Sequence, residues 1–546
     1  MRSKGTAGEA KPWIIASRAV CVAILMVMLL AWFGTARADE TEPREGHFTA
    51  PDTPLTVTGA SALQPGFYQT SEFMIGRVAV GLILLESDGT LDPELSTWTA
   101  DQRQRVLDEV RDGLAWWSNL SPDANLTFIV DDHATQPVAT RYEPIRHPQV
   151  EEGLWIGEAL SKLGYGVGTH WTRVRTYVNA LRSQYDADWA FAIFVVNSAG
   201  DADAAFADRY FAYAYVGGPF LVMTYDNAGY GIANMDAVTA HEVGHIFRAL
   251  DQYASANIGC TARSGYLGVE TQNSQREGCA SNVNSIMRGG VYPYTADAID
   301  PYGAGQIGWR DSDDDGVFDP VDTTPALKLD PAAQVDGTWH ISGEATDAPY
   351  PLAWRPPVTI NDVSVEYRID AGAWQSAEPA DGGFDSPHEG FSLQFRISTV
   401  GNHRVELRAR TNAGNVSQAE SFTIVVLDPV DGGLDTRLDS PAAQQLGNAS
   451  ADGVEGLATS YRDDGSAGPA IARVEYRIDG GAWQTAGPQD GAFDGAEESF
   501  AIPTRLSGGA HLLEACAIDA NGKVEQNTAA LQVEVGHAVY LPMLQR

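Results

Sequence analysis

Residues 239–251 read T-A-H-E-V-G-H-I-F-R-A-L-D, and this stretch decides which fold and chemistry are expected of the chain. His241 and His245 are four residues apart, so a helix places both imidazoles on one face, one turn from each other. Two imidazoles at this spacing can hold one Zn²⁺, with Glu242 placed to take a proton from the water that attacks a carbonyl. A solvated helical face that carries these three residues is the alternative.

A third metal ligand requires a break in this helix. Asp251 would lie about 15 Å along the axis from His241 if the helix continued. The chain must therefore turn between His245 and Asp251 for the carboxylate to bind the same metal. The alternative is that Asp251 is an ordinary residue of a helix C-terminal turn.

The motif resembles that of the metzincin metalloproteases, H-E-x-x-H-x-x-G-x-x-H, which ends in Asp in some branches. The resemblance implies that His241, His245 and Asp251 bind zinc and that Glu242 is the general base. Residues 249–253, A-L-D-Q-Y, which include Asp251 and Tyr253, also resemble a segment of IgA-peptidase-like bacterial metalloproteases. This chain departs from the family by carrying Arg248 in place of a glycine, the residue that most readily adopts positive φ.

A second resemblance lies downstream, where residues 285–288 read S-I-M-R. It implies that Met287 is the Met-turn methionine, an apolar floor beneath the metal; simple core packing is the alternative. Stabilising a developing oxyanion needs a donor, and several metzincins have a tyrosine two residues after the methionine, where this chain has Gly289. The candidate donors are Tyr253, Tyr292 and Tyr294, and the alternative is that they are merely packed with hydrated hydroxyls.

Residues 71–310 are expected to form the α/β zincin-like, metzincin-like metallopeptidase domain. Apolar, β-prone runs predict strands at 77–85, 126–130, 189–196 and 220–225. Helices are expected after a capping box at 99–102, around 150–163 and 171–184, and from about 234. This order of elements is similar to that of metzincins, with the fourth strand at the sheet edge before the active-site helix.

The chain has only four cysteines, which rules out a disulfide-dense scaffold. Cys260 and Cys279 lie between the motif helix and Met287, and in an exported protein they are expected to pair. A loop of this size gains about 3 kcal/mol in the chain-entropy model. Zinc ligation by these cysteines is the alternative, although the spacing lacks a C-x-x-C. Cys516 is left as a free or an intermolecular thiol.

The N-terminus has the pattern of a secretory signal peptide. Basic residues precede an apolar run at 19–33, and A-R-A at 36–38 is typical of a cleavage site. Residues 1–38 are therefore expected to be removed after Ala38, giving a secreted or cell-surface protein without a membrane span. An uncleaved anchor is the alternative, although the run is shorter than the about 20 residues that a span needs. Residues 39–70 have the composition of a linker or short propeptide.

Residues 311–322 read D-S-D-D-D-G-V-F-D-P-V-D, in a predicted calcium-binding linker at 311–335. Alternating carboxylates followed by glycine surround a hard cation with oxygen ligands. The pattern resembles thrombospondin type 3 and dockerin-like loops more than an EF-hand, which requires Glu at position twelve. A solvated acidic linker is the alternative. The predicted Ca²⁺ ligands are Asp311, Asp313, Asp315, Asp319 and Asp322.

The C-terminal half contains a repeat. Residues 365–375, V-E-Y-R-I-D-A-G-A-W-Q, return at 474–484 as V-E-Y-R-I-D-G-G-A-W-Q. A unit of about 110 residues with period-2 strands and Asp/Gly turns predicts two β-sandwiches, at 336–428 and 448–546, joined by a linker at 429–447. They resemble the Ig-like or fibronectin-III-like modules of bacterial secreted proteins. The resemblance implies spacing, adhesion or binding of a surface polymer.

Composition sets the remaining limits. The 546 residues are 44% hydrophobic, enough for several cores, and their net charge of −36 argues against nucleic-acid binding. Together the patterns predict a secreted zinc endopeptidase with a protein or peptide substrate, catalytic Zn²⁺ and structural Ca²⁺. The alternative class is a non-catalytic, calcium-binding adhesin or polymer-binding protein on the same scaffold. A non-peptidase hydrolase on that scaffold is a third, weaker option.

Overall fold

The computed structural model describes residues 43–51, 63–335, 337–352, 354–399, 401–426, 433–439, 454–462, 466–503, 506 and 509–535. The chain forms two compact units, Met1–Asp52 with Thr70–Ile307, and Thr53–Gln69 with Gly308–Arg546. The predicted signal peptide lies outside the described residues. Among the residues that are described, no helix has the length and apolar character needed to cross a membrane.

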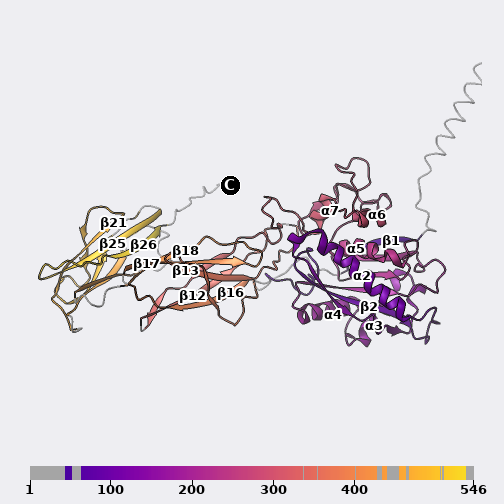
Figure 1. The fold of residues 1–546 in the computed structure, drawn as a ribbon, viewed down its shortest axis with the longest axis horizontal. Coiled ribbons are helices and arrows are strands. Elements are labelled where there is room, and N and C mark those ends of the chain that lie inside the picture. The colour runs from indigo at the N-terminus through magenta and orange to yellow at the C-terminus, as the bar shows by residue number, and fades with distance from the viewer. Residues whose placement is uncertain are drawn as a thin grey trace, which may run out of the picture. The chain divides into compact units, whose positions relative to one another are not determined.

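A seven-stranded sheet lies at the centre of the first unit (Figure 1), in the order β1-β6-β7-β5-β2-β3, with β4 beside β2. The antiparallel pair is β6 with β7, and the other neighbours run parallel. Nearly continuous apolar runs place β2 and β5 in the middle, buried on both faces. The strands are β1 (Arg44–Thr49), β2 (Arg77–Ser87), β3 (Thr127–Asp132), β4 (Val138–Thr140), β5 (Trp189–Val196), β6 (Tyr210–Val216) and β7 (Phe220–Thr224).

Four helices cover this sheet (Figure 1): α2 (Ala100–Leu120), α3 (Glu152–Lys162), α4 (His170–Gln184) and α5 (Met235–Ile246). Helices α3 and α4 pack on one face through a large apolar core. Helices α2 and α5 pack together on the other, where the Trp117 indole donates a 2.9 Å hydrogen bond to the Ala240 carbonyl. Helix α2 begins at the expected capping box of Thr99 and Gln102.

The predicted position of the edge strand is wrong. Phe220–Thr224 lies inside the sheet between β5 and β6, because the missed segment Tyr210–Val216 pairs with its outer side. That segment reads Y-F-A-Y-A-Y-V, an aromatic and alanine alternation that is itself a period-2 strand signal. Strand β1, from the predicted linker 39–70, then adds in parallel to the outer side of β6.

The segment after α5 is mostly loop, with short elements: β8 (Arg263–Ser264), β9 (Val269–Glu270), α6 (Val291–Thr295) and α7 (Pro301–Gln306). The predicted disulfide between Cys260 and Cys279 is confirmed and closes this loop. Cys516, in the second unit, is a buried thiol, and burial raises its pKa to about 11.

The second unit contains two β-sandwiches, each with its own apolar core, which confirms the predicted β-sandwich architecture. In the first, one sheet has β10 (Ala326–Leu329), β11 (Ala333–Val335), β12 (Thr338–Thr346), β15 (Glu378–Pro379) and β16 (His388–Phe395), and the other has β13 (Val363–Ile369), β14 (Gln375–Ser376), β17 (Gly401–Thr411) and β18 (Glu420–Val426). In the second, one sheet has β19 (Leu434–Leu438), β20 (Val454–Ser460), β23 (Gly487–Pro488) and β24 (Glu497–Ile502), and the other has β21 (Ile471–Ile478), β22 (Gln484–Thr485), β25 (Gly509–Asp519) and β26 (Ala529–Val535). Strands β10 and β19 begin in segments that were predicted to be linkers.

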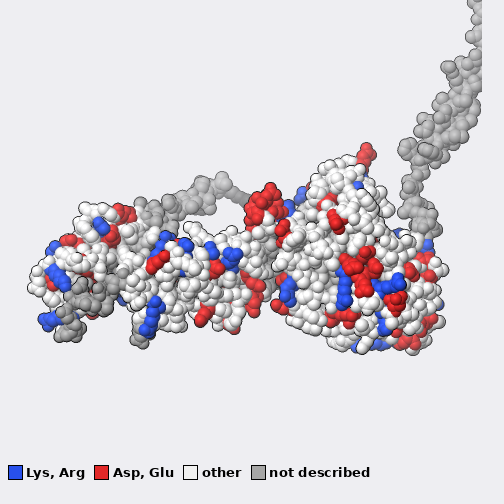
Figure 2. Space-filling view, viewed as in Figure 1, with Lys and Arg blue, Asp and Glu red and all other residues white. Residues whose placement is uncertain are grey.

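The sequence repeat is also a repeat of contacts. Arg368 pairs with Glu406 at 2.7 Å in the first sandwich, and Arg477 pairs with Glu514 at 2.7 Å in the second. Each of these arginines also lies over a tryptophan ring, Trp374 or Trp483 respectively. Figure 2 shows patches of Asp and Glu side chains and patches of Lys and Arg side chains on the face in view.

Candidate metal centre

Helix α5 directs two imidazoles at one point. The Nδ1 atom of His241 lies 2.9 Å from the Ile286 carbonyl, and that of His245 lies 2.8 Å from the Ala249 carbonyl. A carbonyl oxygen only accepts, so each Nδ1 donates, and each Nε2 is left facing the centre. The two Nε2 atoms are 3.2 Å apart. Backbone carbonyls that orient metal-binding histidines in this way are a common supporting shell.

The chain turns sharply after α5 and returns Asp251 to these histidines. The helix ends at Ile246, and Arg248 adopts a left-handed backbone conformation with φ of 78°. The Asp251 Oδ1 atom then lies 3.1 Å from His241 Nε2 and 3.2 Å from His245 Nε2. The structure therefore makes the turn that a third ligand requires, although a non-glycine residue occupies the positive-φ position.

The geometry of these three atoms fits a small divalent cation. Their separations of 3.1–3.2 Å are close to the edge of a zinc tetrahedron, about 3.3 Å for bonds of about 2.0 Å. Asp251 Oδ1 and both carboxylate oxygens of Glu242 are buried without a hydrogen-bond partner. Burying unpaired carboxylate oxygens costs several kcal/mol unless a cation compensates them. Two nitrogens and one oxygen are a donor set that zinc accepts.

The electrostatics of the centre also favour bound positive charge. Burial alone would lower the pKa of His241, but Glu45 and Asp251 raise it well above its ordinary value. Burial alone would raise the pKa of Asp251, but the facing histidines hold it well below its ordinary value. Burial lowers the pKa of His245, so the two histidines differ in this respect. Burial raises the pKa of Glu242 well above its ordinary value.

Met287 packs directly beneath the helix. It is fully buried, and a Cβ atom built on Gly244 would lie only 2.6 Å from its sulfur. Glycine at position 244 therefore permits this close approach. The Met287 carbonyl also accepts a 2.7 Å hydrogen bond from the Gln252 amide, next to Asp251. Met287 thus lies against the part of α5 that carries the histidines.

The three tyrosines predicted as candidate oxyanion donors differ in their surroundings. The Tyr253 hydroxyl donates to Asp251 Oδ2 at 3.0 Å, and its ring lies alongside that of His241. Tyr292 is 72% exposed. Tyr294 stacks on Trp116 and directs its hydroxyl to Asp236, which removes it from consideration as an oxyanion donor. Of the three, Tyr253 is the one whose hydroxyl contacts a candidate ligand.

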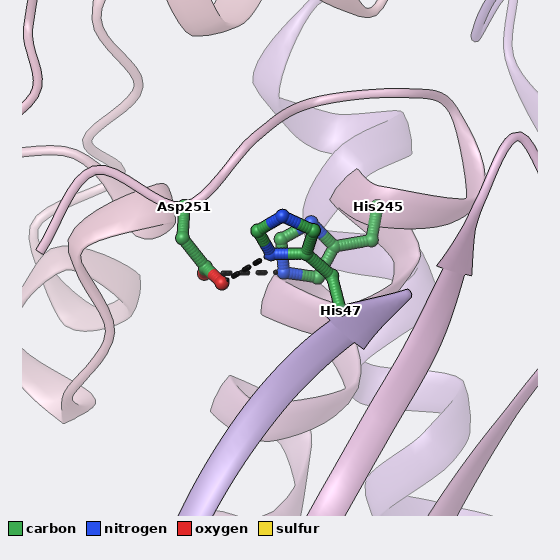
Figure 3. A group of neighbouring side chains, drawn as sticks. All are labelled: His47, His245 and Asp251. Atoms are coloured by element: carbon green, nitrogen blue, oxygen red, sulfur yellow. Dashed lines mark hydrogen bonds and ion pairs between the residues drawn. The ribbon is translucent and has the colours of Figure 1, made fainter. Parts of the chain in front are cut away.

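Sequence reasoning missed three residues at this centre: Glu45, His47 and Tyr230. His47 Nδ1 lies 2.5 Å from Asp251 Oδ2, as Figure 3 shows. The donor atoms of Glu45, His241 and Glu242 lie within 4.8 Å of one another. Tyr230, after β7, accepts a 2.9 Å hydrogen bond from the Gly290 amide. The one available signal was the E-G-H sequence at 45–47, because alternate residues of a strand share a face.

The acidic loop brings together three of its five predicted ligands. The carboxylates of Asp311, Asp313 and Asp315 lie within 4.8 Å of one another, and Gly316 turns the chain with φ of 91°. The Gly316 amide donates to Asp311 Oδ2 at 2.9 Å. Repulsion from Asp315 is the main cause of the raised pKa of Asp313.

The other two predicted ligands have partners of their own. Asp319 is buried and pairs with Arg310 Nε at 2.5 Å, and it also accepts from the Ser312 amide at 2.9 Å. Asp322 accepts from Asn415 Nδ2 at 2.9 Å. The structure thus separates the five carboxylates into one cluster of three and two residues engaged elsewhere.

No protein-family model and no curated protein matches this chain. Among solved structures, it is similar to the fibronectin(III)-like modules of Clostridium thermocellum CbhA, with 17% identity over 40% of this chain and 100% of that chain, at a TM-score of 0.14. It is also similar to the D00-D0 domain of Intimin, with 16% identity over 38% of this chain and 98% of that one, at a TM-score of 0.14. A third similarity is to Bacteroides ovatus SGBP-B in complex with a mixed-linkage heptasaccharide, with 15% identity over 40% of this chain and 48% of that one, at a TM-score of 0.13.

Proposed function

We propose that this chain is a secreted zinc endopeptidase of the metzincin-like class. The observation that carries the proposal is the convergence of two histidine Nε2 atoms and Asp251 Oδ1 at 3.1–3.2 Å beside the unpartnered carboxylate of Glu242. A structural histidine pair would not need a buried carboxylate with both oxygens unpaired next to it. The disulfide supports export, because disulfides persist in oxidising compartments.

Each residue has a defined role in this proposal. His241, His245 and Asp251 would hold the metal, and bound zinc supplies a Lewis acid that activates water and polarises a carbonyl. Glu242 accepts the proton of the attacking water and delivers it to the leaving amine. Tyr253, whose hydroxyl contacts the candidate ligand Asp251, is the proposed donor to the developing oxyanion, which requires its hydroxyl to turn away from Asp251.

Removing zinc is expected to abolish hydrolysis of casein and of a peptide library. Treatment with 1,10-phenanthroline should remove about one zinc per chain and the activity together, because His241, His245 and Asp251 are proposed to hold a single ion. Added Zn²⁺ should restore both, whereas the non-chelating isomer 1,7-phenanthroline should have no effect. Bound metal and cleavage are measured before chelation, after chelation and after zinc is added back. Absence of chelator-sensitive hydrolysis would contradict the proposal.

We propose in addition that the loop at 311–322 binds Ca²⁺ through Asp311, Asp313 and Asp315. The three carboxylates are close together, Asp313 and Asp315 are exposed and Asp311 is half-buried, and the like-charge repulsion at Asp313 is the kind that a cation relieves. For the sandwiches, a surface polymer remains the proposed ligand.

Asp313→Asn is expected to weaken calcium binding about tenfold or more, because it removes one charged ligand. Asp314→Asn is the matched control, since Asp314 lies between two proposed ligands, is outside the cluster and has a φ of 60° that Asn tolerates. Calorimetric titration of each variant with Ca²⁺ measures the affinities. Equal affinities for the two variants would argue that the loop is only an acidic linker.

A further inference from the structure

The residue next to Asp251 is bound to its surroundings at four points, two of them on its backbone. Asp251 lies in a loop, residues 249–253, between α5 and a 3₁₀ turn at Ala254–Ala256. The backbone amide of Gln252 donates to the Met287 carbonyl at 2.7 Å, and its carbonyl accepts from the Gln275 amide at 2.6 Å. The backbone that follows Asp251 is therefore held on both sides.

The side chain of Gln252 supplies the other two points. It is fully buried, its Nε2 donates to Asp300 Oδ2 at 2.7 Å, and its Oε1 accepts from Asn273 Nδ2 at 2.8 Å. A carboxylate only accepts, so this pairing fixes which way the amide of Gln252 points. Asp300 is itself anchored, because it also accepts from the Ser285 hydroxyl at 2.9 Å and from two backbone amides at the start of α7. The position of Gln252 is thus fixed through both its backbone and its side chain.

Two of the partners of Gln252 belong to one covalently closed segment. Asn273 and Gln275 lie between Cys260 and Cys279, which form a disulfide, and we call residues 260–279 the disulfide loop. The regular elements of this loop are the two-residue strands β8 and β9. A segment with so little regular structure has much conformational freedom to lose, and the cross-link removes part of that freedom in advance. Closure of the loop therefore helps to keep Asn273 and Gln275 at the positions that bind Gln252.

The disulfide loop also contacts the chain on either side of Asp251. Before it, the Ser264 hydroxyl donates to the Arg248 carbonyl at 2.6 Å. After it, the side chain of Gln275 accepts from the Ala254 amide at 3.1 Å. The segment that carries the third candidate ligand is therefore attached to this loop before, beside and after the ligand.

We propose that Gln252 is a positioning residue for the zinc ligand Asp251 and that the disulfide loop holds Gln252 in place. The inference rests on the proposed zinc centre but not on peptide hydrolysis. With the loop closed, Asp251 Oδ1 stays 3.1 Å and 3.2 Å from the two histidine Nε2 atoms, a geometry that fits zinc. The centre therefore reaches its full zinc affinity only with the disulfide formed, as in an oxidising compartment.

The contrary interpretation is that the turn at Arg248 places Asp251 without help. Gln252 would then be an ordinary buried amide, and the disulfide would stabilise the fold without acting on the metal centre. The two interpretations differ in zinc affinity. Removing a residue that orients a ligand typically lowers metal affinity about 10–100-fold, whereas a cross-link that only stabilises the fold changes the free energy of unfolding.

Gln252→Met in the full chain removes the two side-chain hydrogen bonds and keeps a side chain of similar length. The groups that bound the amide keep other partners, because Asp300 retains Ser285 and Asn273 Nδ2 still donates to the Val283 carbonyl at 3.0 Å. No buried polar group is left unpaired by the substitution, so the variant is expected to fold.

Asn361→Leu is the matched control, because Asn361 is a buried amide of the first sandwich that donates to the Val321 carbonyl at 2.9 Å. A double variant, Cys260→Ser with Cys279→Ser, removes the disulfide. Zinc affinity is measured by competition with a chromophoric chelator, and ligand geometry by the visible absorption spectrum with Co²⁺ in place of zinc. Circular dichroism at the temperature of the titration shows which variants are folded, and Gln252→Met decides the question if the double variant is not.

We expect Gln252→Met and the double serine variant each to weaken zinc binding about 10–100-fold and to change the Co²⁺ spectrum, with no effect of Asn361→Leu. Combining the three substitutions should cost less than the product of the separate losses, because they act on the same contacts. Wild-type zinc affinity in Gln252→Met, or losses that simply multiply, would overturn the inference. The expected losses without any hydrolysis would uphold it and refute the peptidase function, whereas a wild-type chain that binds no zinc would overturn both.

Discussion

Glu242→Gln is expected to lower kcat/KM for peptide hydrolysis by about 10²–10⁴-fold, while the protein keeps its zinc. Glutamine has the shape of glutamate but cannot accept a proton, so the substitution removes proton transfer and little else. Glu242 is fully buried on α5, and neither carboxylate oxygen has a hydrogen-bond partner, so no structural bond is lost. The effect should therefore fall on kcat, with the Tm of the protein nearly unchanged.

Glu143→Gln is the matched control for this substitution. Glu143 is also buried, and burial raises its pKa to about 7, so that it is already partly protonated at neutral pH. It accepts a hydrogen bond from the Leu95 amide at 3.0 Å and lies apart from the candidate metal ligands. We expect wild-type kcat and zinc content for this variant. Retained hydrolysis in Glu242→Gln would refute a general-base role, and loss of zinc would point to a ligand instead.

Local patterns predicted the parts of this centre that lie close together in the sequence. The spacing of His241 and His245 fixes their relation on any helix, so the sequence was sufficient there. The capping box at Thr99 fixes the start of α2 in the same way. The repeat at 365–375 and 474–484 predicted two similar sandwiches because the same contact within a hairpin, an arginine over a tryptophan ring, is encoded twice. In each case the interacting groups are local or duplicated.

Strand β1 could not be predicted, because its residue pattern indicates a buried strand only once its neighbours, β6 among them, are known. Residues 44–49 are flanked by a Pro- and Thr-rich sequence, and only two of them, Glu45 and His47, face the centre. Both are polar, so no apolar periodicity indicates burial. Their environment is created by α5 and by Asp251, more than 180 residues away in the sequence. The alternation of Glu45 and His47 is a local signal that the two side chains share a face of a strand, but it does not indicate which residues that face contacts.

Arg248 shows a different limit of prediction from sequence. The contacts that allow arginine in place of glycine at this turn are made with residues that lie elsewhere in the sequence. Its φ of 78° costs an L-residue about 1 kcal/mol or more relative to glycine. Its guanidinium, however, forms a 2.9 Å ion pair with Glu72, which is fully buried. The Ser264 hydroxyl also donates to the Arg248 carbonyl at 2.6 Å. These contacts hold the backbone in a conformation that glycine would adopt unaided.

Arg248→Gly, although it restores the residue of the family motif, is therefore expected to destabilise the protein by about 2–4 kcal/mol. Removing one partner of a buried ion pair costs about 3–5 kcal/mol, and glycine at this φ returns only about 1 kcal/mol. The double variant Glu72→Gln with Arg248→Gly should recover part of the loss, because no unpaired charge stays buried. Urea unfolding of the zinc-loaded chain measures each variant, and zinc affinity reports whether Asp251 still reaches the centre.

Arg209→Gly separates the two contributions, because Arg209 has nearly the same backbone conformation, with φ of 75°, and an ion pair with Asp203 that is about one-third exposed. Here the relief of the backbone should equal or exceed the loss of a partly solvated pair, which is worth about 0–1 kcal/mol. We therefore expect Arg209→Gly to be neutral or slightly stabilising. If Arg248→Gly behaved in the same way, the buried pair with Glu72 could not be what holds the turn. The position of Asp251 would then depend on the other contacts of this loop, beginning with the hydrogen bond from Ser264.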